Sequence, residues 1–98
     1  MILGWAEQAL KDREAIWLHI ALDNPYAASR LDALFSDTAQ SLLDFPNMGR
    51  PGQIAGTREI MPHESYRLVY RVEVDQVVIL AVIHTARQWP PPAEGTLS

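Results

Sequence analysis

The sequence predicts an α+β domain in which a hairpin of two helices packs on one face of a small, mostly antiparallel twisted sheet. Apolar residues recur every three or four positions in the first half, residues 5–45, as in amphipathic helices. They recur every second position in the second half, residues 57–84, as in half-buried strands. Turn-forming residues at 46–52 separate the halves. With a short apolar strand at 1–3, the expected order is β-α-α-β-β-β.

The first half is expected to form helices at residues 5–22 and 25–45. Asn24 and Pro25 mark the start of the second helix, because asparagine caps free backbone N–H groups and proline at the first helical position loses no hydrogen bond. The apolar stripes are Trp5, Ala9, Ile16 and Ile20 in the first helix, and Ala28, Leu31, Leu34, Phe35, Leu42 and Phe45 in the second. The short connection predicts a hairpin that covers one face of the sheet.

The second half is expected to form three strands. Their predicted ranges are 57–61, 66–74 and 77–84. In the middle strand, the even positions from Tyr66 to Val74 are apolar or aromatic, whereas the odd positions include Arg67 and Arg71. Alternate residues of a strand point to opposite faces, so one face belongs to the core and the other is cationic. Asp75 and Gln76 are short enough to link the last two strands as a hairpin.

These elements fit one domain at residues 1–90, followed by a flexible C-terminal tail at residues 91–98. Hydrophobic residues make up 48% of the 98 and charged residues 20%, which is typical of a globular chain and not of a disordered one. No apolar run has the length of a membrane span or of a signal peptide core. We therefore expect a cytoplasmic protein without membrane contacts.

The composition of the chain also limits which metal, cofactor and nucleic-acid sites it can form. The chain has no cysteine, and His19, His63 and His84 lack the paired spacing of metal ligands, so neither a metal nor another cofactor is expected. A net charge of −4 argues against broad attraction to nucleic acid, because that attraction is driven by Lys and Arg. Any nucleic-acid contact would have to be local.

Arginines of the second half form a candidate phosphate-binding group. They are Arg58, Arg67, Arg71 and Arg87, which lie on or beside three neighbouring strands and are expected to converge on the uncovered sheet face. Arginine offers a rigid fork of donors that suits phosphate and stabilises the charge of a phosphoryl transition state. The alternative is that these are surface charges paired with nearby acids, namely Glu59, Glu64 and Glu73.

His84 is the candidate for proton transfer, because it ends an apolar strand and is expected on the same face as residues 78, 80 and 82. A histidine there suits general acid or base catalysis near pH 7. The alternative is a structural histidine that only satisfies a local hydrogen bond.

Several motifs together resemble the RelE/ParE superfamily of toxins from type II toxin–antitoxin systems. The motifs are Tyr66-Arg67-Leu68-Val69-Tyr70 with Gly56–Glu59 before it and Ile83–Pro90 after it, together with residues 23–28 and 45–52. The resemblance covers roughly residues 3–90. It implies two N-terminal helices on an antiparallel sheet, and a cognate antitoxin that wraps the toxin in a hetero-oligomer.

The resemblance leaves three activities open. RelE-like members cut mRNA in the decoding site of the ribosome, whereas ParE-like members poison DNA gyrase and have no established nuclease site. A third possibility is a non-toxic relative that binds its antitoxin and acts as a co-repressor. The retained pair Arg67 and Arg87 favours mRNA cleavage slightly over gyrase.

Transfer of the RNA-cleaving site onto this chain is incomplete. The resemblance implies catalytic roles for Arg67 and Arg87, and it places Arg58 where one of two lysines is expected. Ile60 occupies the other lysine position, and the expected C-terminal tyrosine has no counterpart. Because arginine is a poor proton shuttle, that role would fall to His84, His63 or Glu59. For the antitoxin, we expect carboxylates placed near Arg67 and Arg71.

Overall fold

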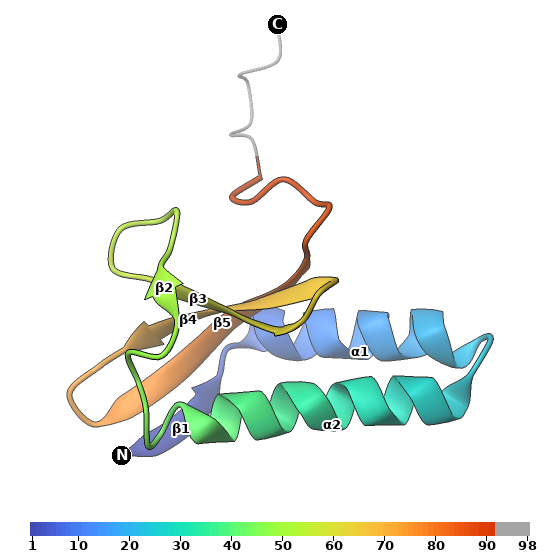
Figure 1. Ribbon diagram of the computed structural model, residues 1–98, viewed down its shortest axis with the longest axis horizontal. Coiled ribbons are helices and arrows are strands. Elements are labelled where there is room, and N and C mark those ends of the chain that lie inside the picture. Colours follow the sequence, from blue (N-terminus) through green and yellow to red (C-terminus); the bar gives the residue numbers. More distant parts are fainter. Residues whose placement is uncertain (92–98) are drawn as a thin grey trace, which may run out of the picture.

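The computed structural model describes residues 1–91 and confirms the predicted fold class: two helices lie against one face of a five-stranded sheet (Figure 1). The helices are α1 (Glu7–Ala21) and α2 (Pro25–Ser41), and the strands are β1 (Ile2–Trp5), β2 (Arg50–Pro51), β3 (Arg58–His63), β4 (Tyr66–Val72) and β5 (Gln76–His84). The two-residue strand β2 was not expected. Of the predicted tail, all but residue 91 lies outside the described residues.

The helix hairpin differs from the prediction mainly at its ends. Trp5 closes strand β1 instead of opening the helix, and α2 stops at Ser41, before Phe45. The predicted cap is present, because the Asn24 side chain accepts a hydrogen bond from the backbone N–H of Ala27 at 3.1 Å. Helical spacing alone cannot tell a strand residue that points at the helices from a residue of the helix itself, which explains Trp5.

The sheet has the strand order β1-β5-β4-β3-β2, and only the pair β1–β5 is parallel. Strand β5 contains a bulge opposite β4. Val69 pairs with Ala81 and Tyr70 pairs with Ile79, which leaves Leu80 without a partner on β4. A bulge inserts one residue into the alternation, so the side chains of β5 change faces at this point. Val82 and His84 therefore lie on the helix side, unlike Val78.

Apolar side chains gather on both faces of the sheet. The helix-side core consists of Ala9, Phe35, Ala39, Leu42, Leu68, Tyr70, Val77, Ile79 and Val82. On the outer face, Val69, Ala81 and Ile83 form a smaller buried cluster against which Trp89 packs. Trp89, which follows β5, thus covers part of the sheet face that was expected to be uncovered.

The loop between α2 and β3 is tied to the core by the hydroxyl of Tyr70. This hydroxyl donates to the backbone oxygen of Pro46 at 2.8 Å and accepts from the backbone N–H of Gly49 at 2.9 Å. A Cβ atom at position 49 would lie 2.7 Å from the same hydroxyl oxygen. Residue 49 must therefore be glycine for the loop to approach Tyr70 this closely.

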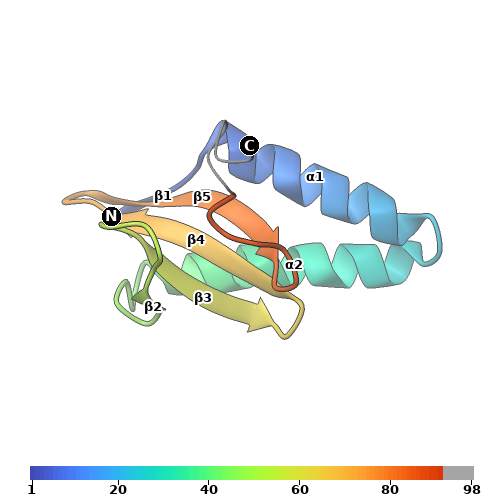
Figure 2. The same cartoon turned by 90° about the horizontal axis from the view of Figure 1, so that it is seen from above.

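The helix hairpin is longer than the sheet beneath it. In both Figure 1 and Figure 2, the turn between α1 and α2 projects beyond the ends of the strands. The inner sides of the helices near that turn are consequently not covered by the sheet. Neither helix within residues 1–91 combines the length and the apolar character needed to cross a membrane.

Candidate functional site

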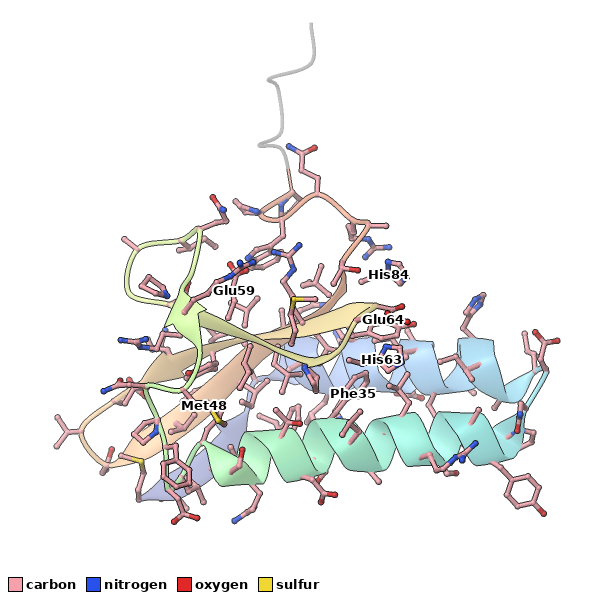
Figure 3. The ribbon with its side chains drawn as sticks, in the orientation of Figure 1. Phe35, Met48, Glu59, His63, Glu64 and His84 are labelled. Carbon is pink, nitrogen blue, oxygen red and sulfur yellow. The ribbon has the colours of Figure 1, made fainter. Side chains whose placement is uncertain are left out.

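Arg67, the first candidate for phosphate binding, lies on the outer face of β4 and is engaged by an acid. Its Nη1 atom is 2.9 Å from Oε1 of Glu59 on β3, and the two side chains are only 17% and 3% exposed. The other carboxylate oxygen of Glu59 accepts the backbone N–H of Gln53 at 3.0 Å. In Figure 3, Glu59 lies on the side of the sheet away from the helices. The guanidinium is therefore part of a nearly buried ion pair.

Glu59 is held in its charged form. Burial raises its pKa, but the hydrogen bond from the Gln53 backbone, the hydrogen bond and charge of Arg67, and the charge of Arg50 all lower it. The net result is a pKa below the ordinary value for glutamate. The ion pair is thus intact at neutral pH, and Glu59 is a poor proton shuttle there.

Two other candidate arginines also interact within the chain. Arg71 lies on the outer face with Nε 3.7 Å from a carboxylate oxygen of Glu73, and the two side chains are 48% and 37% exposed. Arg58 pairs with Tyr70 across β3 and β4, and its Nη1 donates to the backbone oxygen of Gly49 at 2.6 Å. The alternative that the arginines pair with nearby acids therefore describes Arg67 and Arg71, whereas Arg58 supports the loop.

His84 and Arg87 lie on the other side of the sheet, the side that faces the helices. The ring of His84 meets the ring of Tyr66 edge to face, with centroids 5.2 Å apart. Together with Arg87, both rings line a hollow of about 340 Å³ beside α1. Arg67 pairs with Ile83, the residue before His84, and so points to the opposite face. The structure brings His84 and Arg87 together but separates them from Arg67.

A second hollow lies on the α2 side of the same sheet end. It has a volume of about 440 Å³ and shares Tyr66 and His84 with the first. Arg30 of α2 and His63 of β3 also line it. Nothing in the sequence pattern indicates this grouping, because the four residues come from separate elements. The helical spacing of Leu31 and Leu34, which also line this hollow, predicts only a buried stripe.

Comparisons with known proteins agree on the family. The family model for the ParE toxin of the type II toxin–antitoxin system parDE matches residues 3–89. A protein of Sinorhizobium fredii named as toxin Y4kP is 38% identical over 89 residues, which cover 90% of this chain and 92% of that protein. Toxin RelE2 of Caulobacter vibrioides is 34% identical over 83 residues, covering 85% and 93%.

Solved structures share the fold. A structure described as the chromosomal ParDE system of P. aeruginosa superposes with a TM-score of 0.75 at 24% identity, covering 86% of this chain and 95% of that one. A YoeB/ParE toxin from Agrobacterium tumefaciens gives a TM-score of 0.64 at 21% identity, covering 86% and 98%. The family model and the sequence relatives go further than the fold: this chain belongs to the ParE family of toxins from type II toxin–antitoxin systems.

Proposed function

We propose that this toxin arrests growth by poisoning DNA gyrase, as the resemblance to ParE-like toxins implies, and that it does not cut mRNA. The observation that carries the proposal is the ion pair between Arg67 and Glu59. Arg67 is the residue on which the RNA-cleaving interpretation depends most. An arginine that neutralises a buried carboxylate can hold a phosphate only by leaving that pair or sharing its charge with it.

The cost of freeing Arg67 supports this choice. Withdrawing the guanidinium would leave Glu59 charged and 4% exposed, and leaving one member of a buried pair alone costs about 3–5 kcal/mol. The binding free energy of an RNA phosphate at Arg67 would have to offset this loss of stability. The same phosphate would also meet the negative charge of Glu59.

The position of the remaining candidates points the same way. RNA cleavage needs a proton-transfer group and a phosphate clamp on one scissile phosphodiester, within hydrogen-bond reach. His84 and Arg87 lie on the helix side of the sheet, whereas Arg67 and Arg71 lie on the outer side. Arg58 is engaged with the Gly49 carbonyl. A toxin that works by binding a protein target does not need these groups to converge.

We also propose that a cognate antitoxin binds and restrains this toxin in the cell. The family model describes the toxin of a toxin–antitoxin system, and one structural neighbour is described as a ParDE system. Such pairing predicts that the toxin gene adjoins a small open reading frame whose product suppresses its toxicity when the two are expressed together.

The test is a pulse of toxin expression with two parallel readouts, followed by an assay with pure protein. We expect DNA breaks and an SOS response before translation falls, and we expect purified toxin to inhibit supercoiling by gyrase. Normal supercoiling at saturating toxin would overturn the proposal, as would cut codons in ribosome-bound mRNA. Unimpaired growth without antitoxin would leave only the co-repressor function.

A further inference from the structure

The outer side of α1 carries a stripe of large apolar side chains that stay exposed. Leu10, Trp17 and Leu18 are 51%, 37% and 55% exposed. Together with position 14 they have the i, i+4, i+7 and i+8 spacing of one helix face, and they lie opposite Ala9 and Ile16, which pack in the core. A helix with apolar side chains on opposite sides is normally covered on both, so this stripe is suited to a partner.

The helix that carries the stripe is fixed in place. The stripe borders a groove of about 470 Å³ between α1 and α2, and Arg13 and Asp32 line this groove. Nε and Nη2 of Arg13 donate to the two carboxylate oxygens of Asp32 at 2.9 and 2.8 Å. The same guanidinium lies 4.3 Å from the centre of the Trp5 ring. Because these contacts join α1 to α2 and to the sheet, docking on the stripe requires little ordering of the toxin.

Two opposite charges accompany the apolar side chains of the stripe. Lys11 lies 3.1 Å from a carboxylate oxygen of Glu7, but the two side chains are 66% and 83% exposed, and such a pair is weak. Glu14 is exposed and has no ion-pair partner among residues 1–91. The stripe therefore presents one cation and one carboxylate that can pair with a docking surface of matching charge.

We infer that this stripe is the contact surface for a second copy of the toxin, with the two α1 helices antiparallel about a twofold axis beside Glu14. On one side of the stripe, Leu10 lies four residues before Glu14 and Trp17 three residues after it. On the other side, Lys11 lies three residues before and Leu18 four residues after. A twofold axis joins residues of the same side at opposite offsets, so Leu10 of one copy meets Trp17 of the other. Likewise, Lys11 meets Leu18 and reaches Glu14.

A second copy fits the stripe because the stripe is complementary to itself. The twofold axis produces two apolar contacts between Leu10 and Trp17 and two ion pairs between Lys11 and Glu14. The two Glu14 carboxylates approach each other at the axis, and Lys11 of the opposite copy offsets their repulsion. This self-association involves neither DNA gyrase nor an antitoxin, so it goes beyond the function proposed above.

Sedimentation velocity of the purified toxin over a series of concentrations tests the inference, and thermal unfolding verifies that each variant is folded. We expect the wild type to move from monomer towards dimer as its concentration rises. Leu10→Glu, Lys11→Glu and Glu14→Lys should each raise the dissociation constant of the dimer about tenfold or more, because each sets a charge against an apolar side chain or a like charge.

A charge exchange and a distant control complete the design. The double variant Lys11→Glu/Glu14→Lys restores opposite charges across the axis, so its dissociation constant should return to within about threefold of the wild type. Val74→Glu is the matched control for Leu10→Glu, because Val74 is fully exposed in the turn between β4 and β5. It should leave the dissociation constant within about twofold of the wild type.

Each failure points to a different error. A wild-type toxin that stays monomeric at every concentration would overturn the self-association, and a loss of gyrase inhibition in Leu10→Glu would then assign the stripe to the target. A dimer that Leu10→Glu leaves intact uses another surface. A double exchange that does not restore the dimer would refute the antiparallel arrangement. A failed dimer leaves the proposed function standing, since that function is judged by supercoiling and translation.

Discussion

Replacing Arg67 with alanine is expected to destabilise the fold, beyond any effect on activity. The change leaves the Glu59 carboxylate buried with the Gln53 backbone N–H as its remaining donor in the described structure. Removing one side of a buried ion pair costs about 3–5 kcal/mol. Because the Arg67 side chain is 17% exposed, water relieves part of the penalty, and we expect about 3 kcal/mol. That corresponds to a fall of roughly 12–24 °C in melting temperature for a domain of this size.

Urea titration followed by tryptophan fluorescence measures the loss, and thermal unfolding followed by circular dichroism checks it. The matched control is Arg71→Ala, whose half-exposed contact with Glu73 is worth about 0–1 kcal/mol. Replacing both members of the buried pair, with Glu59→Leu and Arg67→Met, should recover most of the loss, since no unpaired charge then remains.

A near-native free energy of unfolding for Arg67→Ala would refute this reasoning. It would mean that Glu59 does not depend on the guanidinium, and that Arg67 is free to serve an incoming phosphate. The argument against mRNA cleavage would then lose its main support.

The remaining predictions concern acid stability and the loop at 46–49. Because the folded-state pKa of Glu59 is lowered, its contribution to stability is complete above about pH 4.3, the unfolded-state value, and is lost as pH falls through the folded-state pKa. Arg67→Ala removes two of the contributions that lower this pKa, so acid should destabilise the variant less than the wild type, and an equal loss of stability on acidification in urea titrations of the two proteins would contradict it. Tyr70→Phe should cost about 1–3 kcal/mol, because it leaves the Gly49 N–H and the Pro46 oxygen without their partner. An unchanged urea midpoint would show that the loop is anchored elsewhere. Gly49→Ala should cost more than Tyr70→Phe in the same titration, since its Cβ atom would lie 2.7 Å from the hydroxyl oxygen.

The order of helices and strands could be predicted because the spacing of apolar residues changes from helical in the first half to alternation along β4 in the second. The faces of β5 could not be predicted, because residues 77–83 are apolar at every position and show no alternation. The bulge at Leu80 therefore could not be predicted from the pattern of apolar residues. Simple alternation placed His84 with Val78, whereas the extra residue turns His84 towards the helices. One unpaired residue thus decided which face carries the histidine.

The candidate site was harder to predict than the fold, since it depends on register. Alternation along β4 correctly assigned Arg67 to the face opposite Leu68 and Tyr70. It gave no indication that Glu59 would lie within 2.9 Å of Arg67, because pairing between β3 and β4 also shifts register between Ile60 and His63. The sequence supplied Glu59 as a possible partner, but only the structure shows that the pair is buried.

The parallel pairing of β1 with β5 has a consequence for when the sheet can form. The partners of residues 2–5 are residues 76–79, which are synthesised much later. Contacts so distant in sequence form late, because the intervening chain must be closed into a loop at an entropic cost. A nascent chain therefore lacks β5, the strand that joins β1 to β4, until residue 84 has been synthesised. We expect the complete sheet to form only after that point.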